Sequence, residues 1–290
     1  MTTQTILITG ASSGIGRDAA LALARDGHHV IAAARRFPAL EALRDAAPGC
    51  AITPLQLDLD DAASIAAAAA ELDRLTAGRG IDALVNNAGF ATAGALAELS
   101  DRDLRAQFET NVFGLMALTR AVLPAMLARG SGRIVNVSSV SGRIPAPVLG
   151  AYHASKYALE ALSDALRMEV APFGVQVVIV EPGTIRTEFA SRTLSEATRA
   201  RAAGSRYASI YERTAQLEAT FDRMAGSTAP VVRAISRAVL ARSPRARYVA
   251  PRKFVALIAL IRLLPTCWVD SVMRRAFGLT RAQLGPGTPN

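Results

Sequence analysis

Short runs of consecutive apolar residues alternate along the chain with longer segments of helical character. The runs cover Ile6–Ile8, Val30–Ala34, Ile52–Leu57, Ala83–Val85, Arg133–Val137, Val175–Val180 and Arg247–Val249. The clearest helical segments are Ala62–Leu75, a stretch from Ser100 to about Arg129, and Tyr152–Val170. Strands that are apolar throughout are buried on both faces, and alternation with helices favours parallel pairing. We therefore expect an α/β fold with a doubly wound, mostly parallel seven-stranded sheet and helices on both faces.

The same pattern divides the chain into one large domain and a tail. Residues 1–250 form the expected α/β domain, within which the polar segment 188–228 is an insertion over the sheet edge. Residues 251–290 form a basic and apolar C-terminal helical extension. Its apolar stretch Phe254–Leu264 has 11 residues and contains Arg262, whereas a membrane span takes about 20. The first five residues lack the features of a signal peptide.

The charged residues are distributed unevenly along the chain. The net charge is +9, yet residues 1–185 carry 15 Lys and Arg against 18 Asp and Glu. Residues 186–290 carry 18 against 6, so the whole positive excess lies in the C-terminal third. No nucleic-acid-binding motif accompanies it, and we expect no nucleic-acid partner. The two cysteines exclude a disulfide framework, match no metal site, and fit a cytoplasmic protein.

The first apolar run is followed by a glycine-rich turn, Thr9-Gly10-Ala11-Ser12-Ser13-Gly14-Ile15-Gly16. Glycines at this spacing let the backbone turn tightly and approach a pyrophosphate at a helix N-terminus. The alternative is a turn that only connects two elements. We favour a dinucleotide site.

The second run ends in Ala34-Arg35-Arg36. A site for NAD usually has an acidic residue here for the ribose 2′-hydroxyl, whereas arginine suits a 2′-phosphate because its planar group donates two hydrogen bonds. The arrangement favours NADP(H) over NAD(H), the alternative being two solvated arginines. Asp58 and Leu59, after the third run, are placed for contacts with adenine.

Tyr152 and Lys156 are four residues apart and share one face of a helix. A free tyrosine has a pKa of about 10, and a nearby ammonium group favours its charged form. Lysine occurs at only two positions in this arginine-rich sequence, 156 and 253. Lys156 is therefore not the default cation of the chain, and we interpret the pair as an acid/base centre.

Polar or glycine-containing segments follow the remaining strands, where ligands bind in such folds. Asn86-Asn87-Ala88-Gly89 follows the fourth run and Ser138-Ser139 the fifth, while Pro182-Gly183-Thr184-Ile185-Arg186-Thr187 follows the sixth. Each segment taken alone is compatible with an ordinary turn. Asn111 lies in the middle of a helical segment, where asparagine is a poor helix former.

Five motifs occur in order, each at a predicted strand end: Thr9–Gly16, Asn86–Gly89, Ser139, Tyr152 with Lys156, and Pro182-Gly183 with Thr187. Together they resemble the classical short-chain dehydrogenase/reductase family over roughly residues 4–250. The resemblance implies a Rossmann-like fold and hydride transfer between a nicotinamide and a carbonyl or secondary alcohol. It implies that Tyr152 is the acid/base, that Lys156 lowers its pKa and holds the nicotinamide ribose, and that Ser139 orients the carbonyl. Asn111 would position a water in the proton relay.

The resemblance also completes the expected set of cofactor contacts. Asn86 and Gly89 would lie near the adenosine ribose, and Ile185 and Thr187 near the carboxamide. The full set of expected contacts is Gly10, Ser12, Ser13, Gly14, Ile15, Gly16, Arg35, Arg36, Asp58, Leu59, Asn86, Ala88, Gly89, Tyr152, Lys156, Pro182, Gly183, Ile185 and Thr187.

The segment Tyr152–Glu160 and Glu181-Pro182-Gly183, together with the extended tail, look most like the steroid and retinol dehydrogenase branch of the family. This resemblance implies a lipophilic ketone, aldehyde or secondary alcohol. Family members form dimers or tetramers, and we expect a homodimer. The tail packs on the core or a second subunit, or contacts a membrane surface. The alternative to an enzyme is a regulator of the same fold that senses NADP without turnover.

Overall fold

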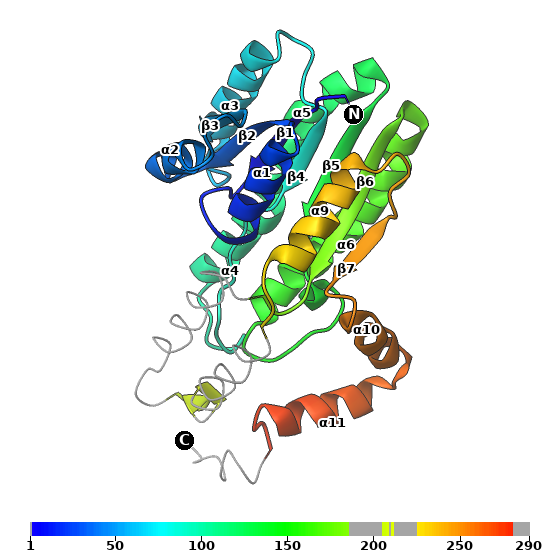
Figure 1. Ribbon diagram of the computed structural model, residues 1–290. Helices are drawn as coiled ribbons and strands as arrows, with labels where there is room; N and C mark the ends of the chain where they lie inside the picture. The colour runs from blue at the N-terminus through cyan, green and yellow to red at the C-terminus, as the bar shows by residue number, and fades with distance from the viewer. Residues whose placement is uncertain (1, 186–204, 209, 212–224, 281–290) are drawn as a thin grey trace.

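The computed structural model describes residues 2–185, 205–208, 210–211 and 225–280. One parallel sheet of seven strands runs through this part of the chain, in the order β3-β2-β1-β4-β5-β6-β7 (Figure 1). The strands are β1 (Thr5–Thr9), β2 (His29–Ala34), β3 (Ile52–Gln56), β4 (Ala83–Asn86), β5 (Gly132–Val137), β6 (Val175–Pro182) and β7 (Arg247–Ala250). The predicted doubly wound α/β fold is confirmed.

Helices cover both faces of the sheet. One face carries α1 (Gly14–Arg25), α2 (Phe37–Asp45) and α9 (Ala229–Leu240); the other carries α3 (Ala62–Leu75), α5 (Leu115–Arg129) and α6 (Gly150–Val170). Figure 1 shows α1 and α9 in front of the strands. The sequence pattern did not single out α2 or α9.

Neighbouring residues of one strand pack on opposite faces of the sheet. In β1, Ile6 and Ile8 contact the core beneath α1 and α9, whereas Leu7 contacts the core beneath α3 and α5. All three side chains are fully buried. Because side chains alternate along a strand, burial on both faces requires an uninterrupted apolar run.

The helical segment beginning after Ser100 changes character in its middle. The Ser100 hydroxyl accepts a hydrogen bond from the Asp103 amide at 3.1 Å and so caps the N-terminus of the segment. Helix α4 (Asp101–Phe108) then passes into a π-helical turn, η1 (Glu109–Gly114), before α5 begins. Such turns often occur at functional sites, and this one contains Asn111.

This continuous segment, Asp101–Arg129, is long and apolar enough to cross a membrane. Leu115, Leu118, Val122 and Met126 of α5 are nevertheless buried in the protein core. A helix buried in a protein core meets the same length and composition criteria, and we interpret the segment as one.

Short helices flank the strand ends and form the C-terminal part of the described chain. They are η2 (Val140–Gly142), η3 (Ala171–Phe173), α10 (Phe254–Leu263) and α11 (Thr266–Ala276). Figure 1 shows α10 and α11 beyond the end of β7, outside the layered body. The predicted insertion 188–228 falls largely outside the described residues.

Candidate active site

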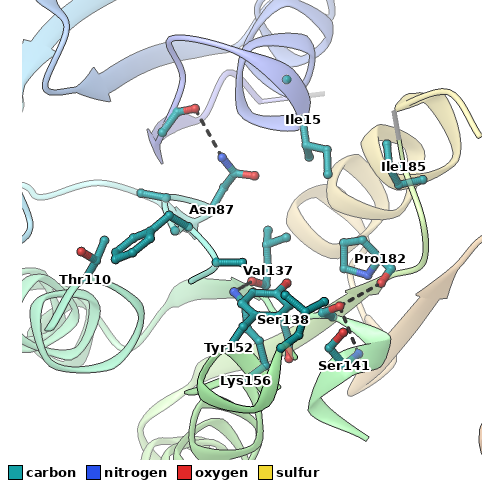
Figure 2. A pocket seen from close by; sticks show the side chains of 18 of the residues that line it. Ile15, Asn87, Thr110, Val137, Ser138, Ser141, Tyr152, Lys156, Pro182 and Ile185 are labelled. Carbon is teal, nitrogen blue, oxygen red and sulfur yellow. Dashed lines mark hydrogen bonds between the residues drawn. The ribbon is translucent and has the colours of Figure 1, made fainter. Parts of the chain in front are cut away.

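A cavity of about 630 Å³ lies at the carboxyl ends of the strands. Most of the sequence-predicted site residues line it, among them the two arginines after β2. Figure 2 shows the Tyr152–Lys156 pair in its wall. The predicted residues in its wall are Gly10, Ser12, Ser13, Gly14, Ile15, Arg35, Arg36, Asp58, Leu59, Ala88, Gly89, Ser139, Tyr152, Lys156, Pro182, Gly183 and Ile185.

The glycine turn provides space for a phosphate group. Gly10 and Gly14 have positive φ values of 67° and 55°, a conformation that residues with a Cβ rarely adopt. A Cβ on Gly10 would lie 2.9 Å from the Ala88 Cα. Helix α1 begins just after Ser13, whose side chain makes no capping hydrogen bond within the described structure. The amide groups at this helix N-terminus suit an anion.

Gly16 has a packing role instead of lining the cavity. A Cβ there would collide with the Gly10 carbonyl oxygen and with the Asn87 side-chain amide. The turn could not close against α1 with any larger residue at this position. The predicted contact between Gly16 and the cofactor is therefore replaced by support of the turn from behind.

Asn86 also lies outside the cavity wall. Its amide nitrogen donates to the Thr119 hydroxyl at 3.0 Å and to the Asn136 side-chain oxygen at 2.9 Å, and the residue is 1% exposed. Asn136 in turn donates to Ser163 at 2.8 Å. We expected Asn86 near the adenosine ribose. In the structure its side chain points away from the cavity and into the protein core.

The neighbouring residue Asn87, which our motif reading passed over, lines the cavity. Its side-chain amide donates to the Thr9 carbonyl at 2.9 Å, and its backbone N–H donates to the Thr9 hydroxyl at 3.0 Å. Asn87 therefore joins β4 to the start of the glycine turn. Side chains alternate at a strand end, so Asn86 and Asn87 face opposite ways and only one of them can line the cavity. This alternation was the signal in the sequence.

Two arginines border the cavity after β2. The Arg36 guanidinium donates to the Ser12 hydroxyl at 3.4 Å, across the mouth of the glycine turn. Arg35 lies 3.8 Å from the Asp60 carboxylate and is exposed. A glycine cradle, an uncapped helix terminus and adjacent guanidinium groups fit the phosphates of a nicotinamide dinucleotide.

Ser139, Tyr152 and Lys156 meet at the inner wall of the cavity, each less than 9% exposed. Figure 2 shows Tyr152 and Lys156 together on α6. The Ser139 hydroxyl donates to the Pro182 carbonyl at 3.4 Å and accepts from the Ser141 amide at 3.1 Å. The Lys156 ammonium donates to the Val137 carbonyl at 3.0 Å and lies 5.8 Å from the centre of the Tyr152 ring.

The two titratable groups of this centre are shifted by burial in opposite directions. Burial raises the pKa of Tyr152 to about 12, although a hydrogen bond with Ser139 acts to lower it. Burial lowers the pKa of Lys156 to about 8, against the pull of the Glu160 carboxylate. We expected a lowered pKa for Tyr152; its pKa is raised instead, because the loss of hydration outweighs the hydrogen bond with Ser139.

Asn111 lies beside this centre, outside the cavity wall. Its side-chain oxygen accepts from the Phe90 amide at 3.1 Å, while its nitrogen donates to the Phe90 carbonyl at 3.0 Å and to Ser155 at 3.1 Å. A Cβ on Gly89 would lie 3.0 Å from the Asn111 oxygen and 3.8 Å from the Lys156 ammonium. Asn111 thus holds the loop after β4 against the catalytic helix. Thr187 lies outside the described residues.

A buried group of charges supports the inner wall from behind. Glu181, which is 1% exposed, accepts from Arg143 at 2.9 Å and pairs with Arg247 at 3.2 Å. Arg247 also contacts Glu160 at 3.2 Å, one helical turn beyond Lys156. The sequence does not reveal these ion pairs, because their members come from segments far apart in the chain.

His153 lines the cavity next to Tyr152, and the sequence assigned it no role. Its Nδ1 lies 3.0 Å from the Ser141 carbonyl, and burial lowers the pKa of its imidazole. The residue therefore supports the η2 turn as a neutral group. Among the described residues, none of the His, Cys, Asp and Glu side chains cluster as metal ligands.

Comparison with known proteins agrees with this geometry. Residues 4–198 match the short chain dehydrogenase family. An uncharacterized oxidoreductase of Escherichia coli, YbbO, is 38% identical over 271 residues, covering 93% of this chain and 94% of its own. An NADPH-dependent 3-dehydrocapnine reductase of Ornithobacterium rhinotracheale is 32% identical over 273 residues, covering 92% and 94%.

Solved structures show the same likeness. A short-chain dehydrogenase from Streptomyces avermitilis has a TM-score of 0.76 at 37% identity, with 99% of both chains covered. One from Burkholderia phymatum in complex with NAD has a TM-score of 0.75 at 26% identity, covering 89% and 92%. One from Sphingobium yanoikuyae in complex with NADPH has a TM-score of 0.69 at 29% identity, covering 90% and 96%. The chain belongs to the short-chain dehydrogenase/reductase family and is an NAD(P)-dependent oxidoreductase acting on CH–OH or C=O groups.

Proposed function

We propose that this protein is an NADP(H)-dependent oxidoreductase of lipophilic ketones, aldehydes or secondary alcohols. The observation that carries the proposal is the composition of the cavity lining. Around the polar Ser139–Tyr152–Lys156 centre, many of the other lining residues are apolar. They are Ala91, Ala93, Ile144, Ala146, Pro147, Val148, Leu149, Phe254, Leu257 and Phe277. An apolar wall with few polar groups favours binding of a lipophilic molecule oriented by its one carbonyl or hydroxyl.

Tyr152, Ser139 and Lys156 have different roles at the reacting group. A nicotinamide bound in the cavity would supply or accept the hydride. Tyr152 gives its hydroxyl proton to the forming alkoxide in reduction, and takes it back in oxidation. Ser139 donates a hydrogen bond that orients the carbonyl. The Lys156 ammonium, 5.8 Å from the centre of the Tyr152 ring, would favour the phenolate of Tyr152 and would hold the nicotinamide ribose of a bound cofactor.

The preference for NADP(H) rests on the residues after β2. Ala34 occupies the position where a carboxylate selects NAD, and Arg36 already lies over Ser12 at 3.4 Å. A 2′-phosphate at this place accepts charge-assisted hydrogen bonds from the guanidinium. A relative named as an NADPH-dependent 3-dehydrocapnine reductase adds support both for NADPH and for reduction of a keto group.

Thermal shift with each cofactor tests the preference. We expect NADP to stabilise the protein more than NAD does, and Arg36→Ala to weaken NADP binding about tenfold or more while sparing NAD. Arg44→Ala, an exposed arginine paired with Asp45 on α2, is the matched control. Equal or better stabilisation by NAD contradicts the proposal.

A carbonyl panel with the preferred cofactor then tests the substrate class. We expect turnover of long-chain or polycyclic ketones and aldehydes. Turnover of small sugars or hydroxy acids alone would remove the lipophilic substrate. Binding of cofactor with no turnover across the panel would favour a regulator.

We also propose a homodimer. Exposed apolar side chains form a stripe along α6, including Tyr157, Ala161 and Met168, and Phe113 of η1 is 57% exposed. A stripe of this kind suits a self-complementary helical interface. Sedimentation equilibrium of Met168→Glu tests it, and an unchanged mass would contradict this interface.

A further inference from the structure

Helices α10 and α11 carry half of the exposed large apolar side chains of the described residues. Of the 12 large apolar side chains that are exposed, six lie in residues 251–280, and they are 43–84% exposed. These are Val255, Leu257, Leu260, Leu263, Trp268 and Val272. In α10, Ile258 is the one buried residue, and α11 has none. Exposed apolar surface on this scale marks an interaction site.

The same segment is strongly basic. Residues 251–280 contain five exposed cations and one carboxylate, that of Asp270. The cations are Arg252, Lys253, Arg262, Arg274 and Arg275. They occur among the exposed leucines and the tryptophan, a combination that binds an anionic bilayer surface through both apolar insertion and charge.

The segment also forms part of the cavity wall. Phe254 and Leu257 of α10 and Phe277, which follows α11, line the cavity. Phe254 packs directly on Gly183 after β6, where a Cβ would collide with its ring. Leu257 lines the cavity and is also 43% exposed. The exposed apolar surface and the apolar cavity wall are therefore continuous.

We propose that α10 and α11 form a docking surface for an anionic membrane, and that lipophilic substrate enters the cavity from the bilayer. The entry route rests on the proposed function; the docking surface does not. A second copy is a poorer occupant, because a two-fold contact through this face would bring its five cations against the same five. Apolar insertion also distinguishes the surface from one that binds nucleic acid.

Trp268 provides a direct readout, because it is the single tryptophan of the chain and is 62% exposed. Its emission is recorded with vesicles of pure phosphatidylcholine and with vesicles containing roughly one third phosphatidylglycerol. We expect a blue shift and co-sedimentation with the anionic vesicles, with binding at least about tenfold stronger than to the neutral ones. Added salt should weaken this binding.

Two variants make the result specific to this surface. Leu260→Ser combined with Leu263→Ser removes exposed apolar groups that do not line the cavity, and should reduce vesicle binding about tenfold or more. Phe173→Ser is the matched control, since Phe173 is 57% exposed but lies before β6, at the opposite end of the strand. It should bind vesicles as the unmodified protein does. The cofactor-induced thermal shift should remain unchanged in both variants.

Three outcomes would overturn the proposal. They are absence of binding to anionic vesicles at low salt, equal binding by the double variant, and loss of self-association in the double variant by sedimentation equilibrium. The last would show that a second copy covers the surface. Because vesicle binding is measured without substrate, a protein that binds vesicles but reduces only polar carbonyls loses the proposed substrate class and keeps the docking surface.

Discussion

The inner wall of the cavity and its C-terminal cap, α10 and α11, are built on opposite principles. On the inner wall, Tyr152 and Lys156 are at most 8% exposed, and Glu181 behind them is 1% exposed. In the cap, apolar side chains face outward and Ile258 is the one buried residue of the two helices. One cavity therefore combines two kinds of lining. The polar centre is desolvated and requires fixed partners, whereas the apolar rim formed by α10 and α11 buries few of its side chains.

The largest effect is expected from the catalytic hydroxyl. Tyr152→Phe removes the group that transfers the proton and leaves the ring in place, so we expect kcat to fall about 10³-fold or more. The free energy of unfolding should change little. Steady-state kinetics and urea unfolding measure the two quantities. Tyr157→Phe, on the exposed side of the same helix and 41% exposed, should keep full activity; a comparable loss there would refute the assignment.

The second prediction compares stability between the two regions. Glu181→Gln leaves Arg143 and Arg247 without their shared carboxylate, and we expect a loss of about 3 kcal/mol in the free energy of unfolding. Leu263→Ser in the cap, where the side chain is 84% exposed, should change it by less than about 0.5 kcal/mol. Urea unfolding of both variants provides the measurement. Equal losses would erase the distinction between wall and cap.

The smallest effect concerns pH. The Lys156 pKa of about 8 in the folded protein lies below the value of about 10.4 in an unfolded chain. Between these values the unfolded state binds more protons, so stability rises with pH. From pH 8 to pH 10 the unmodified protein should gain about 2 kcal/mol relative to Lys156→Met. Urea unfolding across this range, without cofactor, measures the difference. A constant difference would show that Lys156 is not desolvated.

Much of the fold could be predicted because strands buried on both faces must be apolar throughout. Ile6, Leu7 and Ile8 reveal their strand whichever face each residue contacts. The parallel order then brings the glycine turn, Ser139 and Tyr152 to one end of the sheet. These motifs are local in sequence, and the topology determines where they meet.

The missing parts depend on orientation and on contacts between distant segments. Asn86 and Asn87 are identical side chains, and only the direction of the β4 strand end decides which one lines the cavity. The contacts of Arg247 with Glu160 and Glu181 join residues that are 87 and 66 positions apart. The pKa of Tyr152 depends on how completely its surroundings exclude water, which a four-residue spacing does not encode.

The side chains of Thr119, Asn86, Asn136 and Ser163 form a continuous chain of hydrogen bonds that joins α5, β4, β5 and α6. At its two ends, the Thr119 hydroxyl donates to the Leu115 carbonyl at 2.9 Å and the Ser163 hydroxyl to the Leu159 carbonyl at 2.6 Å. Replacing one member strands a buried donor or acceptor, whereas an apolar contact would tolerate sliding. This hydrogen-bond network therefore fixes the positions of α5 and α6 relative to the sheet. We expect its four residues to change together in evolution or to stay unchanged.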